Sequence, residues 1–372
     1  MEIERTFVGL DVHARSVVAC ALDDVTGELS KARLVPDNEM IFAWLRALPG
    51  PVAVVYEAGP TGYGLARFLT GRGLRCVVAA PSKMHRPAGD RVKTDAKDAM
   101  LLARLLRLGE ITAVTVPSLA QEAARDLVRV REDVRADLMR ARHRTSKLLL
   151  RQGILWSGGT AWTGAHEQWL HQQRFGLAGL QAAYDTTLET VLLATSRRAR
   201  LDKAIAEMAH EPQWWPTVSR LQCLRGVSTL TAFGLTVEVG DWTRFSGSTI
   251  GAYLGLVPTE NSSGEGRRQG SITKTGNTHA RRLLVEAAWH HRRPYRPTKT
   301  MRDRWDLAPA AARARGHAGN QRLHERWVRF NERNKRTVIA NVAVARELAG
   351  WCWSLAIIED TAATLGGRSI AP

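Results

Sequence analysis

Long apolar runs are missing from this 372-residue chain. No stretch approaches the about 18 consecutive apolar residues that a membrane-spanning helix needs, so no membrane partner is expected. The first five residues also lack the basic-then-apolar pattern of a signal peptide. Cysteine is scarce, and the four cysteines lie far apart in apolar surroundings: Cys20, Cys76, Cys223 and Cys352. This spacing favours buried thiols over zinc ligands or disulfides, and we expect a cytoplasmic protein.

Acidic residues are few relative to basic ones. The chain has 53 Lys and Arg against 36 Asp and Glu, a formal net charge of +17. Such an excess points first to nucleic acid, and second to an anionic membrane surface or a ribosome-like partner. The length is sufficient for two or three domains, each with its own core.

Residues 1–115 have the pattern of an α/β domain. Apolar runs over 7–12 and 16–22 predict a β-hairpin of buried strands. Strands are expected over 52–57 and 75–80, with helices over 42–48 and 63–70. This strand-helix-strand order implies a parallel component of the sheet that is covered on both faces.

Four carboxylates occupy positions that suit a functional site. Asp11 and Glu57 stand where predicted strands end, and functional groups of such sheets gather at the carboxyl ends of strands. Asp95 and Asp98 lie three residues apart at the start of a helix that Thr94 or Asp95 can cap, so they share a face. The structural alternatives are a turn-starting Asp11 and an acidic first turn that complements the helix dipole.

Together these four residues offer the oxygen ligands that hard divalent ions prefer, Mg²⁺ or Mn²⁺. Two such ions could activate a nucleophile and stabilise the leaving oxygen in phosphodiester cleavage. The nearby Lys93 and Lys97 could hold a phosphate backbone beside the acids. An acidic pocket rimmed by bases indicates a nuclease.

Residues 116–211 have a helical pattern typical of a linker. Apolar residues recur at spacings of three and four among charged ones, which predicts a helix of coiled-coil type: Leu127, Val130, Val134 and Leu138. A spacer role and a dimerisation role both remain open.

A further domain is expected over 212–372. Its residues 221–232 predict helix, tight turn and helix, similar to a helix-hairpin-helix whose backbone N–H groups contact phosphate. That motif usually has a second glycine where this chain has Ser228. Farther on, basic residues interleave with Trp289, Trp305 and Trp327, a pattern that suits backbone contact and base stacking. The apolar stretch 338–353 predicts a buried helix.

The stretch 255–277 is rich in glycines, hydroxyl groups and bases. A flexible surface loop explains the glycines. It does not explain why Ser262 and Ser263 stand among five cations: Arg267, Arg268, Lys274, Arg281 and Arg282. A serine near several cations could attack a phosphodiester, because the cations would stabilise the developing charge.

These motifs, in this order, resemble the insertion-sequence transposases with a DEDD tetrad. The resemblance covers nearly the whole chain and is carried by residues 8–12, 56–58, 93–99, 224–232, 262–264, 272–277 and 345–350. It implies an RNase H-like (RuvC-like) nuclease domain over 1–115 and a helical coiled-coil linker over 116–211. It further implies a mainly α transposase domain over 212–372, with the helix-hairpin-helix-like element and a catalytic-serine loop.

The resemblance also implies roles for residues and partners. Asp11, Glu57, Asp95 and Asp98 would hold Mg²⁺, and Ser262 or Ser263 would form a covalent link to DNA. A structured guide (bridge) RNA encoded by the element would select donor and target DNA. Homodimers would pair into a tetramer, with composite sites formed by the acids of one subunit and the serine of another.

The sequence therefore predicts a DNA transposase or recombinase of a bacterial insertion sequence that uses metal-assisted, serine-dependent strand cleavage and exchange. One alternative is a structure-specific RuvC-like endonuclease, such as a junction resolvase, that uses the four acids alone. Another is a basic RNA-binding scaffold without catalysis. The Ser262–Ser263 pair discriminates between the transposase and the resolvase, because a resolvase does not need these serines.

Overall fold

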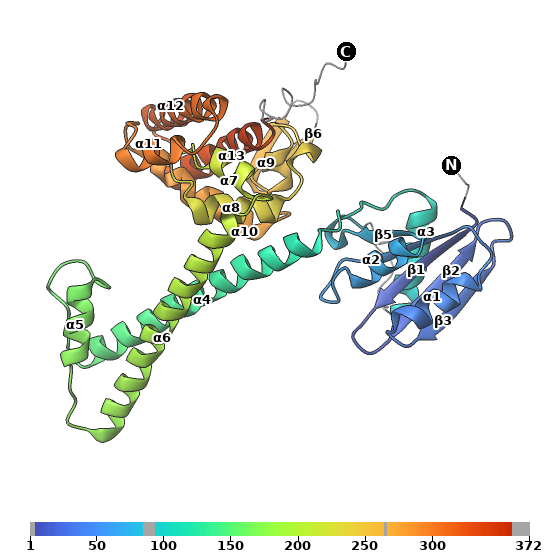
Figure 1. The fold of residues 1–372 in the computed structure, drawn as a ribbon, viewed down its shortest axis with the longest axis horizontal. Helices are drawn as coiled ribbons and strands as arrows, with labels where there is room; N and C mark the ends of the chain where they lie inside the picture. The colour runs from blue at the N-terminus through green and yellow to red at the C-terminus, as the bar shows by residue number, and fades with distance from the viewer. Residues whose placement is uncertain (1–3, 85–93, 264–265, 359–372) are drawn as a thin grey trace, which may run out of the picture. The chain divides into compact units, whose positions relative to one another are not determined.

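The structure, a computed structural model, describes residues 4–84, 94–263 and 266–358. Contacts within the chain separate two compact units, residues 1–118 and residues 119–372 (Figure 1). The predicted further division of the second part into a linker over 116–211 and a domain over 212–372 stays a prediction.

The first unit is built on a five-stranded mixed sheet of order β3-β2-β1-β4-β5. Its strands are β1 (Thr6–Val12), β2 (Val17–Asp23), β3 (Leu29–Leu34), β4 (Val52–Glu57) and β5 (Arg75–Ala79). β1, β2 and β3 pair antiparallel, whereas β4 pairs parallel with both β1 and β5. The predicted hairpin and the parallel component are confirmed. The sequence did not indicate β3, because its edge-strand residues are largely exposed and only partly apolar.

Helices cover both faces of this sheet, as predicted. The helices of the unit are α1 (Asn38–Arg46), α2 (Gly64–Gly71) and α3 (Asp95–Arg107), and a 3₁₀ turn spans Pro81–Lys83. Val8, Leu10 and Tyr56 share a core cluster with α1 and α2. Phe7 and Val55, which alternate with them along the strands, pack instead with α3. Odd-numbered residues of β1 and β4 therefore face α3.

In the second unit, two long helices lie side by side. They are α4 (Leu119–Arg151) and α6 (Ala178–Ala209), with α5 (Gly164–Gln172) between them in the chain (Figure 1). Leu138 and Ala141 of α4 form a buried cluster with Val191 and Ala194 of α6. Of the predicted α4 stripe, Val130 is half exposed. The prediction considered only large apolar residues. It therefore left out Ala141 and Ala194, whose small side chains let the two helices approach closely. The coiled-coil assignment stays a prediction.

The remainder of the second unit is mostly helical. Its elements are α7 (Trp215–Leu221), α8 (Thr229–Val239), α9 (Ile250–Tyr253), β6 (Pro258–Ser263), β7 (Gly266–Ile272), α10 (Thr278–Ala288), α11 (Lys299–Trp305), α12 (Ala310–Glu332) and α13 (Thr337–Ala356), with 3₁₀ turns at Trp242–Arg244 and Trp289–Arg292. Phe233 and Trp327 are among the residues of its core. α13 is buried over most of its length, as predicted, but Val338 in its first turn is 66% exposed.

The predicted catalytic-serine loop is instead a β-hairpin. β6 and β7 pair antiparallel from Pro258–Ile272 to Ser263–Gly266. Strands with one buried face show alternating apolar and polar residues, but the described residues of this hairpin are mostly exposed. Its sequence therefore carries no alternation that predicts strands. A glycine shortly after the hairpin serves close approach: at Gly276, where φ is +70°, a Cβ atom would lie 1.9 Å from the carbonyl oxygen of Tyr253. A side chain at Gly276 would push apart the segments that precede and follow the hairpin.

Among the residues that the structure describes, no helix combines the length and the apolar character needed to cross a membrane.

Candidate functional site

The candidate site of the first unit lies where β1 ends and α3 begins. α3 can approach this end of the sheet because β1 has glycine at position 9: a Cβ atom there would lie 2.0 Å from the carbonyl oxygen of Ala99. Thr94 is the N-cap of α3, and its side chain accepts a hydrogen bond from the backbone N–H of Lys97. The cap fixes the first turn of α3, which carries Asp95.

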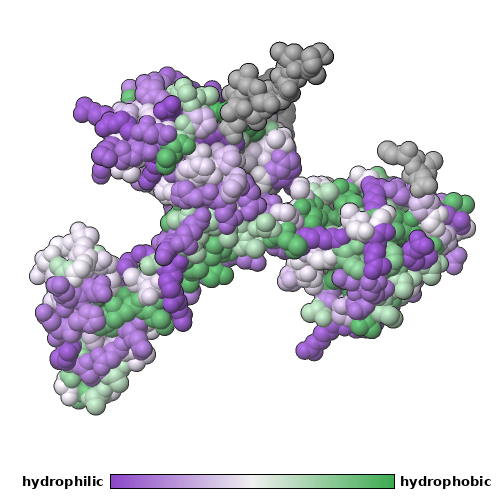
Figure 2. Space-filling model, viewed as in Figure 1, coloured by the Kyte–Doolittle hydropathy of each residue, from purple (hydrophilic) through white to green (hydrophobic). Residues whose placement is uncertain are grey.

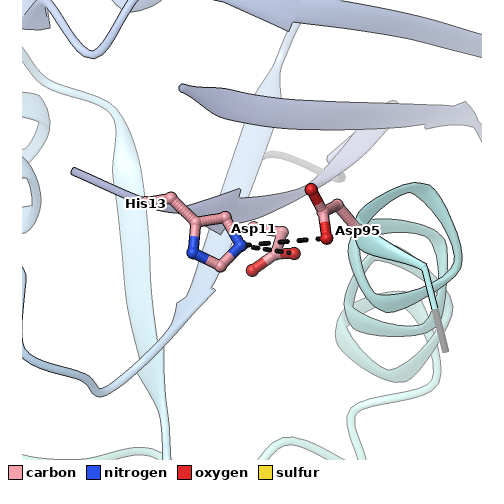
Figure 3. Close-up of side chains that lie close together, drawn as sticks. All are labelled: Asp11, His13 and Asp95. Carbon is pink, nitrogen blue, oxygen red and sulfur yellow. Dashed lines mark hydrogen bonds and ion pairs between the residues drawn. The ribbon is translucent and has the colours of Figure 1, made fainter. Parts of the chain in front are cut away.

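Three ligating side chains converge there (Figure 3). Nε2 of His13 lies 3.2 Å from Oδ2 of Asp11 and 3.9 Å from Oδ1 of Asp95. One ligand atom of each residue lies within 4.8 Å of the ligand atoms of the other two. Among the residues that the structure describes, this is the group of three ligating side chains that could hold a metal ion. The Asp11 side chain is 20% exposed, whereas those of His13 and Asp95 are about half exposed. Two carboxylates and an imidazole form a donor set that can hold a divalent cation from the solvent side.

Glu57 and Asp98 are adjacent in backbone position but are not members of this group. Glu57 follows Tyr56, which pairs with Leu10, so Glu57 stands next to Asp11 on the neighbouring parallel strand. Both positions are odd-numbered and face α3. Asp98 lies three residues after Asp95 on the same helix face. The structure thus brings Asp11 and Asp95 together, and the full four-carboxylate site stays a prediction.

His13 was not predicted. Its signal in the sequence was its position two residues after Asp11, because side chains at i and i+2 of an extended segment point to the same side. The backbone N–H of His13 donates to the carbonyl of Ser16 at 3.0 Å, which holds the residue at the base of the β1–β2 turn.

The cations predicted to contact nucleic acid are distributed over both units. Lys93 lies outside the described residues, and Lys97 lies in the first turn of α3. Arg268 and Lys274 are exposed, and Lys274 has a left-handed backbone with φ of 56°. The backbone of Arg267 pairs with Ser262 in the hairpin. Their contact with nucleic acid stays a prediction.

Arg281 and Arg282 have partners within the protein. Nη1 of Arg281 donates to the carbonyls of Leu254 at 3.0 Å and Thr275 at 2.8 Å. Burial lowers the pKa of Arg281. Arg282 forms ion pairs with Glu132 of α4 and with Glu286. Arg281 therefore ties together the two chain segments that lead into and out of the hairpin.

Both candidate nucleophiles are on β6. The register places Ser262 opposite Arg267 and Ser263 opposite Gly266, at the end of the hairpin that is farthest from its base. The base is held by backbone hydrogen bonds from Lys274 N–H to Gly255 at 3.1 Å and from Thr273 N–H to Val257 at 2.9 Å. The two serines are thus part of a hairpin with an anchored base.

A buried carboxylate near this base was also not predicted. Glu238 accepts hydrogen bonds from Nε and Nη2 of Arg129, at 3.0 and 2.9 Å, and from Nδ2 of Asn277 at 2.6 Å. Nδ1 of His279 lies 3.0 Å from Oε1 of the same carboxylate. Burial alone would raise the pKa of Glu238, but the hydrogen bonds from His279, Arg129 and Asn277 outweigh it and lower the pKa to about 2. Because Asn277 caps α10, Glu238 links α4 and α8 to the segment that follows the hairpin.

The predicted helix-hairpin-helix-like element consists of α7, a turn and α8. Gly226 in the turn has φ of +82°, and a Cβ atom there would lie 2.5 Å from the carbonyl oxygen of Ala287. The side of the turn at Gly226 is therefore packed against α10. Its assignment as a helix-hairpin-helix stays a prediction.

Comparison with known proteins gives the class of this chain. A family model described as "Transposase" matches residues 8–153, which include most of β1 and all of α3, with Asp11 and Asp95. A second, described as "Transposase IS116/IS110/IS902 family", matches residues 218–305, which include the β6–β7 hairpin. Both parts of the chain that carry candidate site residues thus match transposases.

Relatives match over most of their lengths. "Putative transposase y4qE" of Sinorhizobium fredii is 38% identical over 95% of this chain and 89% of its own length. "Transposase for insertion sequence element IS1533" of Leptospira borgpetersenii is 31% identical over 89% of this chain and 98% of its own. A transposase for the insertion sequence element IS1111A of Coxiella burnetii is 24% identical over 76% of each chain. The chain belongs to the IS116/IS110/IS902 family of transposases, and the resemblance inferred from its sequence motifs is confirmed.

Proposed function

We propose that this protein is a DNA transposase that moves its own insertion sequence by metal-assisted, serine-dependent cleavage and exchange of DNA strands. The observation that carries the proposal is the convergence of Asp11 and Asp95, from segments far apart in the chain, within a domain that matches transposases. The net charge of +17 supports DNA as the substrate.

The donor set fits a divalent metal ion. Asp11 and Asp95 would hold it, with Glu57 and Asp98 close enough along the backbone to complete a carboxylate site and His13 as an additional nitrogen ligand. A bound Mg²⁺ or Mn²⁺ would supply Lewis-acid stabilisation of charge on a phosphodiester. The protein contributes the positions: β1 fixes Asp11, and the Thr94 cap fixes the start of α3.

Ser262 is our first candidate for the nucleophile, and Ser263 is the second. In the proposed step, the serine hydroxyl gives up its proton and its oxygen attacks a DNA phosphorus, which forms a phosphoserine ester as the bond from phosphorus to the deoxyribose oxygen breaks. The deoxyribose oxygen takes up a proton and leaves as a hydroxyl, so that protons balance. Attack by the hydroxyl of another DNA end would then release the serine and join the strands. The exposed Arg268 and Lys274 would stabilise negative charge in this region.

The finer fold assignments belong to this proposal. An RNase H-like (RuvC-like) first unit is supported by three antiparallel strands followed by two parallel ones, with the acids at the ends of β1 and β4. Dimerisation through a coiled coil, and pairing of dimers into a tetramer, are supported by apolar residues exposed along α4 and α6: Val130, Met139, Leu150 and Leu193. Figure 2 shows hydrophobic surface along the two long helices. A structured guide RNA is carried over from the sequence resemblance, and a cytoplasmic location from the scattered cysteines.

The proposal is tested with full-length protein, a donor plasmid that carries the element and a target plasmid. Ser262→Ala and Ser263→Ala are compared with Ser30→Ala, which removes an exposed hydroxyl from β3. We expect one of the two hairpin variants to lose strand exchange by roughly 100-fold or more. The same variant should lose the DNA-linked protein that survives denaturing gel electrophoresis, while DNA binding is kept. Ser30→Ala should behave as the parent.

The alternative function gives a different outcome. If both serine variants keep full strand exchange while Asp11→Asn abolishes it, the serine role is wrong and a metal-dependent nuclease of the resolvase type is favoured. If Asp11→Asn also keeps full activity in the presence of a chelator, the metal-assisted mechanism is wrong.

A further inference from the structure

The second unit contains a groove that none of the roles above uses. Its volume is about 1250 Å³. One wall is the outer face of α13, another is formed by Arg315, Arg326 and Phe330 of α12, and a third is formed by residues 269–272 of β7. The volume exceeds the about 300–1,000 Å³ typical of small-molecule pockets, and so the groove fits a segment of a polymer better than a metabolite.

α13 presents an unusual stripe to this groove. Its inner face buries Val344 and Leu348 completely. The groove is lined by Ile339, Arg346 and Trp353, which recur at helical spacing on another face. At the start of this stripe Val338 and Ile339 are 66% and 50% exposed. The first turn of α13 is thus apolar and open to solvent, whereas Trp351 and Trp353 farther along the helix are partly buried against the core.

Aromatic rings hold cations at the walls of the groove. The Arg326 guanidinium and the Lys335 ammonium each lie 4.8 Å from the ring centroid of Phe330. Arg315 lies 4.4 Å from the ring of Trp351. Such cation–π contacts keep the cationic groups in place without neutralising their charge.

The charge of the lining is strongly positive. Four cations line the groove: Arg315, Arg326, Lys335 and Arg346. The carboxylate in the lining, Glu347, already pairs with Arg322 at 3.1 Å and with Arg326 at 3.5 Å. The core of a protein-binding interface is usually depleted in charge, so a helix of a partner protein fits this lining poorly. An anionic chain that also offers flat apolar faces fits it well.

We propose that this groove binds a segment of single-stranded DNA. Its phosphates would contact Lys335 and Arg346, and its bases would stack on the Arg315 guanidinium that lies over Trp351 and pack against Val338 and Ile339 of α13. The proposal rests on the DNA transposase function proposed above. It adds a place for a strand that has been separated from its complement, because β7 forms a groove wall and belongs to the hairpin that carries Ser262 and Ser263.

The test measures binding without chemistry, so that it does not depend on the serine or the metal. Full-length protein in the presence of chelator is titrated into a fluorescent single-stranded oligonucleotide of mixed sequence, and anisotropy is recorded over a range of salt concentrations. We expect Lys335→Ala and Arg346→Ala each to weaken binding about three- to tenfold and to reduce the salt dependence by about 0.7 per lost phosphate contact. Lys203→Ala, which removes an exposed cation of α6, is the matched control and should leave both unchanged.

The stacking contribution needs its own pair of variants. Trp351→Leu should weaken binding roughly tenfold, whereas Trp351→Phe, which keeps an aromatic face, should retain most of the affinity. Equal melting temperatures of the parent and Lys335→Ala establish that the lost affinity is not a folding defect. On addition of the oligonucleotide, amide hydrogen exchange over residues 338–346 should slow.

The proposal is overturned if the groove variants bind the oligonucleotide as the parent and control do. It is also overturned if the same variants lose affinity only for RNA of the same sequence, or if a second copy of the chain, and not DNA, protects residues 338–346. Loss of strand exchange by the serine variants together with unchanged oligonucleotide binding by the groove variants would leave the transposase function standing and remove only this site.

Discussion

β1 and α3 touch through Gly9 and Ala99, where a methyl group on Gly9 would lie 2.0 Å from the carbonyl oxygen of Ala99. The same added atom would lie 2.7 Å from the backbone nitrogen of Ala103. These are backbone atoms of a helix, which cannot rotate away as a flexible side chain would. The contact sets the distance between the strand that carries Asp11 and the helix that carries Asp95.

Gly9→Ala should therefore separate the two acids. We expect a loss of at least about 1–3 kcal/mol in the free energy of unfolding of the first unit, because the helix must shift to admit the methyl group. We also expect weaker binding of Mn²⁺, measured by calorimetry without DNA. Gly64→Ala is the control, since a Cβ atom there meets nothing within 4 Å. Equal Mn²⁺ affinity of Gly9→Ala and the parent would contradict this view of the site.

His13 should influence which metal ion the site prefers. Imidazole is a good ligand for transition ions but a poor one for Mg²⁺, which favours oxygen. His13→Ala should weaken binding of Mn²⁺ by roughly tenfold and that of Mg²⁺ much less, so the preference for Mn²⁺ falls. Binding is measured by titration calorimetry with each ion. His143→Ala, which removes an exposed imidazole of α4, should change neither affinity.

An equal loss for both ions in His13→Ala would indicate that His13 only orients Asp11 through their 3.2 Å contact. No loss for either ion would exclude it from the site. Asp11→Asn provides the reference for complete loss, because it replaces a charged ligand on β1 with a neutral one.

The sequence predicted the sheet of the first unit well where strands are buried. β1, β2 and β4 are largely apolar runs, and such runs mark strands covered on both faces. β3 was missed because an exposed edge strand carries residues that are also common in loops. Asp11 and Asp95 were found because each lies at an end of an element, Asp11 at the end of β1 and Asp95 at the start of α3, where polar side chains can gather.

What the sequence could not supply depends on long-range contacts. Glu238 stands among apolar residues of α8, and only the folded chain brings Arg129 and Asn277 to it. Arg281 was predicted to contact nucleic acid because it is a cation near the serines. Its carbonyl partners, Leu254 and Thr275, come from both ends of the hairpin and are not visible in a pattern of residue types.

Glu238 should make the stability of the second unit depend on acid. The folded-state pKa is lowered to about 2, so the carboxylate stabilises the fold above its ordinary pKa. That contribution, about 3 kcal/mol, is lost as the pH falls from about 4.5 toward 2. Glu238→Gln should be less stable than the parent near pH 7, and the difference should shrink over this acid range.

Chemical unfolding followed by tryptophan fluorescence measures this, because every tryptophan except Trp44 lies in the second unit. Glu286→Gln, which removes an exposed carboxylate paired with Arg282, is the control and should show a difference that is small at all pH values. A constant gap between Glu238→Gln and the parent from pH 7 to pH 2.5 would contradict the assigned pKa.

Arg281 and Arg268 should separate hairpin anchoring from DNA contact. Arg281 donates to two carbonyls at the hairpin base, whereas Arg268 is an exposed residue of β7. Arg281→Met should lower the free energy of unfolding by about 1–3 kcal/mol, because the carbonyls of Leu254 and Thr275 lose a charged donor. It should also slow strand exchange more than it weakens DNA binding, since the serines would lose their fixed position.

Arg268→Ala should leave stability unchanged, weaken DNA binding and reduce its salt dependence. Thermal melts, anisotropy and the strand-exchange assay measure the three quantities on each variant. If Arg281→Met reduced DNA affinity and its salt dependence as Arg268→Ala does, with no change in stability, Arg281 would be a phosphate contact and the hairpin would be held in some other way.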